Sequence, residues 1–316
     1  MRAKARYRIR NWQDYNKSLV QRGRINVWFS DDAIRNWLAE KEEGKKGHPV
    51  VYSDTVILTA VMVRSVFHMP LRALQGFLTS LVSLMKIELP IPNYTRICRR
   101  AKSLGQELDK LSKKPVTDLV IDSTGLKVYG EGEWKVRQHG YSKRRTWRKI
   151  HLAVCPDSHE IVFEILTENT VGDSEVYPIF MEAAPKTVKR TYGDGAYDTE
   201  GCYKASNEHG SKLITPPQKN AIFKKDPPEH LQPRNNAVLE ILGLGGNEDA
   251  RKLWKKLKGY HLRSLSETAM FRFKTLFGNN LMSRCLVNQK SEVYIKSMAL
   301  NIMTRLGMPI SDRVTS

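Results

Sequence analysis

The stretch Val116-Thr117-Asp118-Leu119-Val120-Ile121-Asp122 marks the point where the residue pattern changes from helical to strand-like. Its branched and aliphatic residues favour an extended strand, and Ser123-Thr124-Gly125 behind it indicates a turn. The strand is therefore predicted to end at Asp122, which places a carboxylate at the rim of a sheet.

The residues after Asp122 alternate between strand-like and helical segments. The pattern predicts four more strands, at 147–154, 161–166, 187–192 and 212–214, and two helices, at 176–184 and 199–208. The resulting order β-β-β-α-β-α-β predicts a mixed sheet with helices packed on it, and it matches the element order of the ribonuclease-H-like fold. Proline and glycine punctuate residues 218–250, which are interpreted as a mobile connector with a short helix near Val238.

The residues before this strand are mostly helical in pattern. Ser53 is a candidate cap for a helix through 56–63, Pro70 opens a second helix through 71–81, and Asn93 is a candidate cap for a basic helix over 94–111. The last of these carries Arg96, Arg99, Arg100 and Lys102. A helix, a turn and a basic helix are typical of DNA-binding modules, although a plain helical bundle with a solvated basic face fits the same pattern. We thus predict a helical DNA-binding region at 1–115 and a catalytic domain with a helical tail at 116–316.

The charge balance points to an anionic partner. Lys and Arg number 52 against 33 Asp and Glu, which gives a net charge of +19. Nucleic acid is the commonest partner of such a chain, because Lys and Arg release condensed counterions from its phosphates. No C-x-x-C pair, signal peptide or bilayer-length apolar stretch is visible, so we expect a cytoplasmic protein with no membrane contact.

Two aspartates are candidates for metal chemistry. Asp122 follows the first strand, and Asp194 follows the fourth within Gly193-Asp194-Gly195. Carboxylates at strand ends meet at one rim of a sheet, and their hard oxygens suit Mg²⁺. An aspartate in such a place is also commonly a turn or cap residue. Asp173 and Asp198 compete for the role, and we assign helix caps to both.

Four residues near the end of the chain have a helical spacing. Tyr260, Arg263, Glu267 and Lys274 fall within an arc of roughly 60° at 100° per residue. A carboxylate that binds metal beside cations that hold phosphate suits phosphodiester chemistry. The alternative is an ordinary surface salt bridge from Arg263 to Glu267.

Basic residues alternate with aromatic residues over 127–149. Tyr129, Trp134 and Trp147 stand among lysines and arginines that include Arg148 and Lys149. This mixture suits tracking of a DNA backbone with base stacking, so the segment is a candidate DNA contact. A solvated loop whose rings pack on the core is the alternative.

Taken together, these motifs resemble those of a known family. Tyr260-x2-Arg263-x3-Glu267-x6-Lys274 resembles the Y-R-E-K signature of bacterial insertion-sequence transposases of the DDE class. The segments 120–127 and 192–198 look like that family's two Asp motifs, and Arg148-Lys149-x-His151-Leu152 lies between them. With Pro70-Leu71-Arg72 and Pro92-Asn93-Tyr94, the resemblance covers nearly the whole chain and is greatest to the insertion sequence five group. Cys155 departs from the pattern, where an acidic residue is expected.

The resemblance implies a ribonuclease-H-like core, a divalent metal and recognition of terminal inverted repeats. In this interpretation Asp122, Asp194 and Glu267 hold two Mg²⁺ ions, with Mn²⁺ as a substitute, while Tyr260, Arg263 and Lys274 position phosphate. The element ends are cleaved and their 3′-hydroxyls are joined to double-stranded target DNA. A homodimer is expected in the synaptic complex of a bacterial cell. The alternatives are a structure-specific nuclease without strand transfer and an inactive, transposase-derived repressor.

Overall fold

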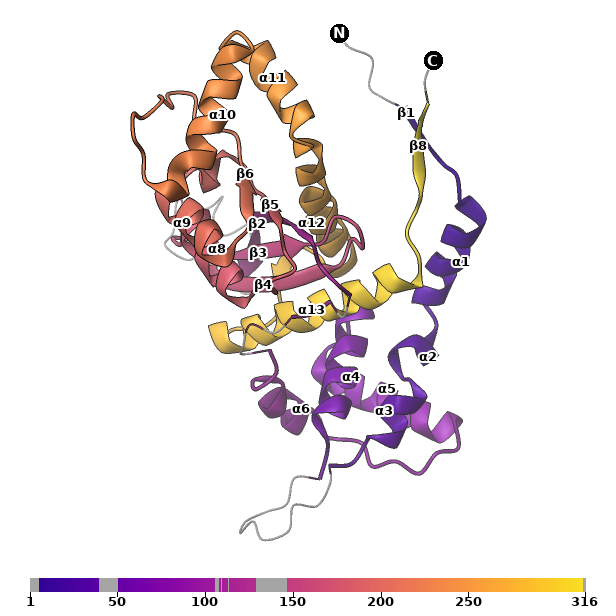
Figure 1. Cartoon of the computed structure of the whole chain (residues 1–316). Coiled ribbons are helices and arrows are strands. Elements are labelled where there is room, and N and C mark those ends of the chain that lie inside the picture. Colours follow the sequence, from indigo (N-terminus) through magenta and orange to yellow (C-terminus); the bar gives the residue numbers. More distant parts are fainter. Residues whose placement is uncertain are drawn as a thin grey trace, which may run out of the picture. The chain divides into compact units, whose positions relative to one another are not determined.

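The computed structural model describes residues 6–39, 51–105, 108, 110–112, 114–128 and 147–314. The chain divides into two compact units, of which the first contains Met1–Leu104 and Met298–Ser316 and the second contains Gly105–Ser297. The residue boundary between the units falls within helix α13 (Leu286–Leu306), which is labelled in Figure 1. These units differ from the predicted ranges 1–115 and 116–316, because the end of the chain joins the first unit.

The first unit is largely helical, and its caps are those that the sequence predicts. Its helices are α1 (Trp12–Arg22), α2 (Ile25–Trp28), α3 (Asp31–Arg35), α4 (Asp54–Val66), α5 (Leu71–Leu84) and α6 (Tyr94–Ala101). The Ser53 hydroxyl accepts the Val56 amide at 3.3 Å, and the Asn93 side chain accepts the Arg96 amide at 2.8 Å. Pro70 is the N-cap of α5. Buried residues on α4, α5 and α6, including Ile57, Leu78 and Ile97, form the core.

Helix α6 is shorter than predicted, because it ends at Ala101 and not at residue 111. Its last turn tightens through bonds from the Ser103 amide to the Arg100 carbonyl and from the Leu104 amide to the Ala101 carbonyl. Gly105 then has a left-handed φ of +66°, which ends the helical path. Among the described residues no single helix has the length and apolar composition of a bilayer span, and α4 with α5 reaches them only across a 111° bend.

A two-stranded sheet joins distant parts of the first unit. Strand β1 (Arg6–Ile9) pairs antiparallel with β8 (Ser311–Val314), so that residues near the two ends of the sequence lie side by side (Figure 1). The Asn11 side chain donates to the Met308 carbonyl, and Arg22 donates to the Gly307 carbonyl, both at 3.0 Å. No local pattern marks these strands, because each has its pairing partner about 300 residues away.

The second unit is built on the predicted mixed sheet. Its order is β4-β3-β2-β5-β6, with β7 paired to the far end of β2. Strands β3 and β4 run antiparallel to β2, whereas β5 and β6 run parallel to it. The strands are β2 (Asp118–Val128), β3 (Trp147–Val154), β4 (Ile161–Glu168), β5 (Arg190–Tyr192), β6 (Lys212–Ile214) and β7 (Asn280–Leu281). The predicted bounds of β3 and β6 are confirmed, while β5 begins three residues later than expected.

Helices cover both faces of this sheet. Leu119, Ile121 and Phe163 form one buried cluster with residues of α8 and α9, and Val120 and Ile214 form another with α10 and α11. Alternate residues of β2 thus face opposite layers, as the period of a strand requires. The helices are α8 (Asp173–Ala183), α9 (Glu200–His209), α10 (Gln232–Gly243), α11 (Glu248–Leu257) and α12 (Ser264–Phe277), with short 3₁₀ turns η1 (Gly195–Tyr197), η2 (Glu229–Leu231) and η3 (Tyr260–Arg263). Gly210 ends α9 in a left-handed conformation, as predicted.

Strand β2 does not end at Asp122, and the turn predicted at 123–125 is wrong. The strand pairs with β3 as far as Lys127, opposite Trp147. Its other edge pairs with β5 only over Asp118, Leu119 and Val120. Asp122 therefore lies in the middle of a strand, just past the point where the pairing with β5 stops.

The segment 218–250 is not the irregular connector that the sequence suggested. It contains η2, all of α10 and the start of α11. Ala237, Val238 and Ile241 are spaced for one helical face and are buried. The punctuating residues mark helix ends, because Pro233 stands in the first turn of α10 while Gly245 and Gly246 take positive φ values of +113° and +68° after it.

Candidate active site

Asp122 stands at the centre of a polar cluster in the second unit. One carboxylate oxygen accepts the Ser123 amide at 2.8 Å, and the other accepts Arg263 Nη1 at 3.0 Å and the Ser266 hydroxyl at 3.3 Å. Burial raises the pKa of Asp122, against the lowering effects of the Ser123 amide and Arg263, and the charge of Asp194 raises the pKa further. The side chain is thus a half-buried acid whose ionised form is stabilised by a nearby cation.

Asp194 follows β5 and begins the turn η1. Its carboxylate accepts the Ala196 amide at 2.8 Å, and its carbonyl accepts the Thr215 hydroxyl at 2.5 Å. A side chain at Gly193 would stand 2.6 Å from the ring of Tyr197, so this position requires glycine. The charge of Asp194 affects the pKa of both Asp122 and Tyr260, which places its carboxylate in the same electrostatic neighbourhood.

Arg263 links Asp122 to Glu267. Its guanidinium forms ion pairs with both carboxylates, one on β2 and one on α12. The i, i+4 pair that the sequence offered as an alternative is therefore present, but it extends inward to Asp122. The single helix face predicted for residues 260–274 is wrong, because Tyr260–Arg263 forms the tighter turn η3 and α12 begins at Ser264.

Tyr260 and Lys274 complete the cluster. Burial raises the pKa of Tyr260 to about 12, Arg263 acts in the opposite direction, and the charges of Asp194, Asp122 and Glu267 add to the increase. Lys274 Nζ donates to the Thr124 hydroxyl at 2.6 Å, and burial lowers its pKa. Thr124 lies two residues beyond Asp122 on the same face of β2. The three predicted metal ligands and the three predicted phosphate contacts thus lie in one region around β2, β5, η3 and α12.

The donor chemistry of this region suits a hard divalent cation. Carboxylate oxygens are the ligands that Mg²⁺ prefers, and the charge of Asp194 contributes to the raised pKa of Asp122, so negative charge accumulates here. Over the part of the chain that the structure describes, however, no three His, Cys, Asp or Glu side chains stand close enough to hold one ion. Arg263 supplies the positive charge between Asp122 and Glu267 in this arrangement.

Arg148 and Lys149 are engaged within their own unit. Arg148 donates to the Gln289 side chain at 3.0 Å, and Lys149 donates to the Val171 carbonyl at 2.9 Å and pairs with Asp173 at 3.2 Å. A DNA contact at either residue would require these bonds to be exchanged. The rest of the predicted basic and aromatic segment, residues 129–146, lies outside the described residues.

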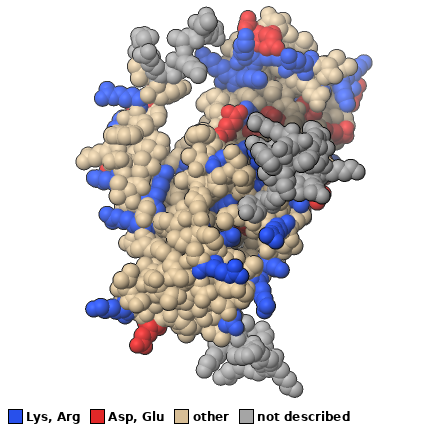
Figure 2. All heavy atoms as spheres, turned by 180° about the vertical axis from the view of Figure 1, so that it is seen from behind, with Lys and Arg blue, Asp and Glu red and all other residues tan. Residues whose placement is uncertain are grey.

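The arginines of α6 fall into two groups. Arg100 bonds to the Tyr52 carbonyl and forms an ion pair with Asp54, so it fixes α6 to the start of α4. Arg96 and Arg99 are exposed, and the Arg96 guanidinium lies 5.4 Å from the Tyr52 ring centroid. On the face of the molecule drawn in Figure 2, Lys and Arg side chains are spread widely, while Asp and Glu are fewer.

The capping roles assigned to Asp173 and Asp198 are wrong. The N-cap of α8 is Gly172, and Asp173 instead pairs with Lys149 and lies 3.5 Å from His151 Nδ1. The N-cap of α9 is Thr199. Asp198 is fully buried and accepts bonds from Arg234 Nε at 3.0 Å, the Tyr203 hydroxyl at 3.0 Å and the Gln218 amide at 2.8 Å. Arg234 lies within 218–250, the segment predicted to be a connector, so no local pattern in the sequence indicates the Asp198–Arg234 ion pair.

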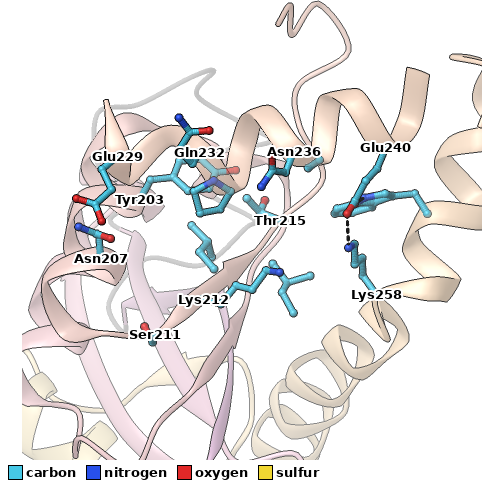
Figure 3. A pocket seen from close by; sticks show the side chains of 15 residues that line it. Tyr203, Asn207, Ser211, Lys212, Thr215, Glu229, Gln232, Asn236, Glu240 and Lys258 are labelled. Carbon is cyan, nitrogen blue, oxygen red and sulfur yellow. Dashed lines mark hydrogen bonds and ion pairs between the residues drawn. The ribbon is translucent and has the colours of Figure 1, made fainter. Parts of the chain in front are cut away.

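A cavity beside β6 and the α10–α11 pair is separate from this cluster (Figure 3). Tyr203, Lys212 and Asn236 line it, and Glu240 in its wall accepts bonds from Lys258 at 2.6 Å and from Trp254 at 2.7 Å. None of the three predicted metal ligands and none of Tyr260, Arg263 and Lys274 is among the lining residues. This cavity is therefore not the carboxylate site.

The fold and the cluster define an α/β protein with a mixed sheet, consistent with a ribonuclease-H-like core, and with acids on β2 and directly after β5. Residues 114–302 match a family model described as a transposase DDE domain, and residues 20–131 match a second model of the same description. The first match covers more than half of the sequence. The chain belongs to the family of DDE transposases.

Proposed function

We propose that this chain is an insertion-sequence transposase of the Y-R-E-K type, in the insertion sequence five group. It binds the terminal inverted repeats of its element, cleaves the ends by phosphodiester hydrolysis and joins the freed 3′-hydroxyls to target DNA. One observation carries the proposal, namely the ion pairs that connect Arg263 to Asp122 on β2 and to Glu267 on α12, with Asp194 close by. Residues far apart in sequence thereby meet at one site.

Asp122, Asp194 and Glu267 are the residues that would hold the metal, two Mg²⁺ ions or Mn²⁺ in their place. Bound there, such ions would activate the attacking oxygen and stabilise the leaving one. The Asp122 carboxylate is half-buried, and it accepts bonds from the Ser123 amide, Arg263 and the Ser266 hydroxyl, which fix its orientation. Arg263 keeps the acids paired, and it can turn towards phosphate when another cation takes its place.

Tyr260, Arg263 and Lys274 would orient the scissile phosphate. A guanidinium matches two phosphate oxygens in one plane, and an ammonium and a phenol add single bonds. The Thr124 hydroxyl holds Lys274 beside β2, two residues from Asp122. Arg96 and Arg99 on α6 are proposed to contact the repeat DNA through their exposed side chains. The protein would act as a homodimer, since two ends must be joined, in the cytoplasm of a bacterial cell.

The proposal is tested with DNA that carries the element's own ends. The purified chain should cleave it with Mg²⁺ and leave it intact with a chelator. Pre-cleaved ends distinguish the alternatives, because a transposase joins them to a target plasmid whereas a simple nuclease does not. Binding of the ends without any metal-dependent cleavage would instead favour the repressor.

We expect DNA affinity to fall steeply with salt, because phosphate contacts by Lys and Arg release counterions. Replacing Arg96 and Arg99 with Ala should lower the slope of log affinity against log salt by about 2, one unit for each lost contact. Arg35→Ala is the matched control, since Arg35 is an exposed arginine paired with Asp32 on α3. Fluorescence anisotropy over a salt series measures the slope. An unchanged slope in the double variant would remove α6 from the interface.

Lys274→Ala should reduce cleavage without abolishing it. The substitution removes a cation near Thr124 and no carboxylate, and such electrostatic contacts are worth on the order of 10²–10³ in rate. Single-turnover cleavage measures the loss, with Lys204→Ala on the exposed side of α9 as control. A rate within a factor of about 3 of the wild-type rate would contradict the assignment of Lys274.

A further inference from the structure

The α10–α11 pair has a leucine-rich outer face. On α11, Ala250 and Trp254 are buried against the sheet, while Leu253 and Leu257 are 43% and 67% exposed. The last two are four residues apart and therefore lie on one side of the helix. Figure 1 shows α10 and α11 as two long helices standing beside each other on the second unit. One face of α11 thus packs against the sheet, and another face presents a short apolar stripe made of Leu253 and Leu257.

A shallow apolar hollow borders this stripe. Its lining combines Leu257 with the turn that follows α10, and the residues are Glu240, Gly243, Leu244, Trp254, Leu257 and Lys258. The glycine leaves room beside Leu244, which is itself partly exposed. The hollow can accept an aliphatic side chain from another surface, because its walls are mainly carbon.

The charges near the two ends of α11 favour one direction for a second helix that packs against it. Asp249 and Lys256 flank the leucine stripe on the same side, within roughly 60° of Leu253 at 100° per residue. They lie seven residues apart, about 10 Å along the axis. A second α11 packed antiparallel would bring its lysine to this aspartate and its aspartate to this lysine. A parallel neighbour would oppose like charges. Asp249 also pairs with Lys252 at 2.8 Å within its own helix.

We propose that α11 packs antiparallel against the α11 of a second copy of this chain, about a two-fold axis near Leu253. Such an interface is isologous, so each contact occurs twice and the surface needs only to complement itself. Leu253 meets its counterpart beside the axis, and Lys256 of each copy lies opposite Asp249 of the other. The inference rests on the proposed function and adds to it the surface through which the two copies of the homodimer contact each other. This dimer is expected to form in the absence of DNA.

Sedimentation velocity of the full chain without DNA tests the leucine stripe. The wild type should show a monomer–dimer equilibrium, and Leu253→Lys with Leu257→Lys should weaken it at least about 100-fold, since two lysines and their counterparts would meet without partners. Leu84→Lys on α5 is the control, because Leu84 is 82% exposed and lies in the first unit. A wild type that stays monomeric, or a leucine variant that still dimerises, would overturn the proposal.

An exchange of charges tests the antiparallel arrangement itself. Asp249→Lys and Lys256→Glu should each dimerise at least about 10-fold more weakly, because like charges then meet at both ends. Mixed together, the two variants should form a heterodimer, since one copy has lysine at both ends and the other has acids at both. The double variant in one chain should also recover self-association. A mixture that sediments as two monomers would exclude this interface.

These measurements separate the interface from the proposed chemistry. If cleavage of the element ends fails while the charge exchange restores association, the dimer surface stands and the transposition proposal falls. If cleavage succeeds and the charge exchange has no effect, the homodimer must use another surface. Far-ultraviolet circular dichroism of every variant checks that α10 and α11 remain folded.

Discussion

Asp122→Asn should abolish DNA cleavage and strand transfer while the fold and the DNA affinity are retained. Asparagine has nearly the shape of aspartate, but it carries no charge and ligates hard cations poorly. Metal ions contribute several kcal/mol to stabilising the charge of such transition states, so the loss should be on the order of 10³-fold or more. Asp194→Asn and Glu267→Gln should have the same effect.

The fold of the Asp122→Asn variant provides an internal check. Burial raises the pKa of Asp122, and an acid whose pKa is raised by folding stabilises the protein at acidic pH. This contribution is lost as the pH rises through the folded pKa, so the ionised carboxylate opposes folding at neutral pH. The melting temperature of the variant should therefore be no lower than that of the wild type at pH 7. As the pH falls, the melting temperature of the wild type should rise relative to that of the variant.

A matched control distinguishes loss of a site carboxylate from the loss of one negative charge elsewhere on the protein. Asp157 lies in the exposed turn between β3 and β4, and Asp157→Asn should leave cleavage unchanged. Wild-type rates in Asp122→Asn would mean that these carboxylates do not perform the chemistry of the family. Loss of DNA affinity in the same variant would mean that the substitution damages binding.

Asp198→Ala should destabilise the second unit strongly. Asp198 is fully buried, and it pairs with Arg234 while accepting bonds from Tyr203 and Gln218. Removing one partner of a buried ion pair typically costs about 3–5 kcal/mol, because the other charge is left without compensation. This loss far exceeds the roughly 1 kcal/mol of a helix cap, the role that sequence had suggested.

Urea unfolding measures this change in the free energy of unfolding. A double variant shows how much of the change comes from the unpaired charge of Arg234. Arg234→Met removes the orphaned charge, so Asp198→Ala with Arg234→Met should cost clearly less than the sum of the single changes. Thr199→Ala at the actual N-cap of α9 serves as comparison for a local effect. A loss below about 1 kcal/mol in Asp198→Ala would show that the buried pair contributes no more than a cap.

Local signals in the sequence predicted local structure well. The caps Ser53 and Asn93, the stop at Gly210 and the bounds of β3 all follow from side chains that act on their immediate neighbours. Failures occurred where the partner lies far along the chain. Strand β2 continues past Asp122 because β3 pairs with it, and β1 exists only because β8 does.

The candidate site shows the same division. Motifs predicted Asp122, Asp194, Glu267 and Arg263 as site residues, and the spacing of four predicted the Arg263–Glu267 ion pair, which the structure contains. The bond from Arg263 to Asp122 joins residues 141 positions apart, so no local pattern contains it. The 3₁₀ turn before α12 was missed for a different reason, because helical spacing alone does not distinguish 3₁₀ from α geometry.

The pairing of β1 with β8 has a consequence for the newborn protein on the ribosome. Domains usually fold as they emerge, beginning with the one nearest the amino terminus. Here β1 has no strand to pair with until residues 311–314 have been translated, whereas strands β2 to β6 of the larger sheet precede those residues by a long stretch of chain. The sheet that carries the proposed catalytic cluster is therefore expected to form before β1 can pair with β8 and complete the first unit.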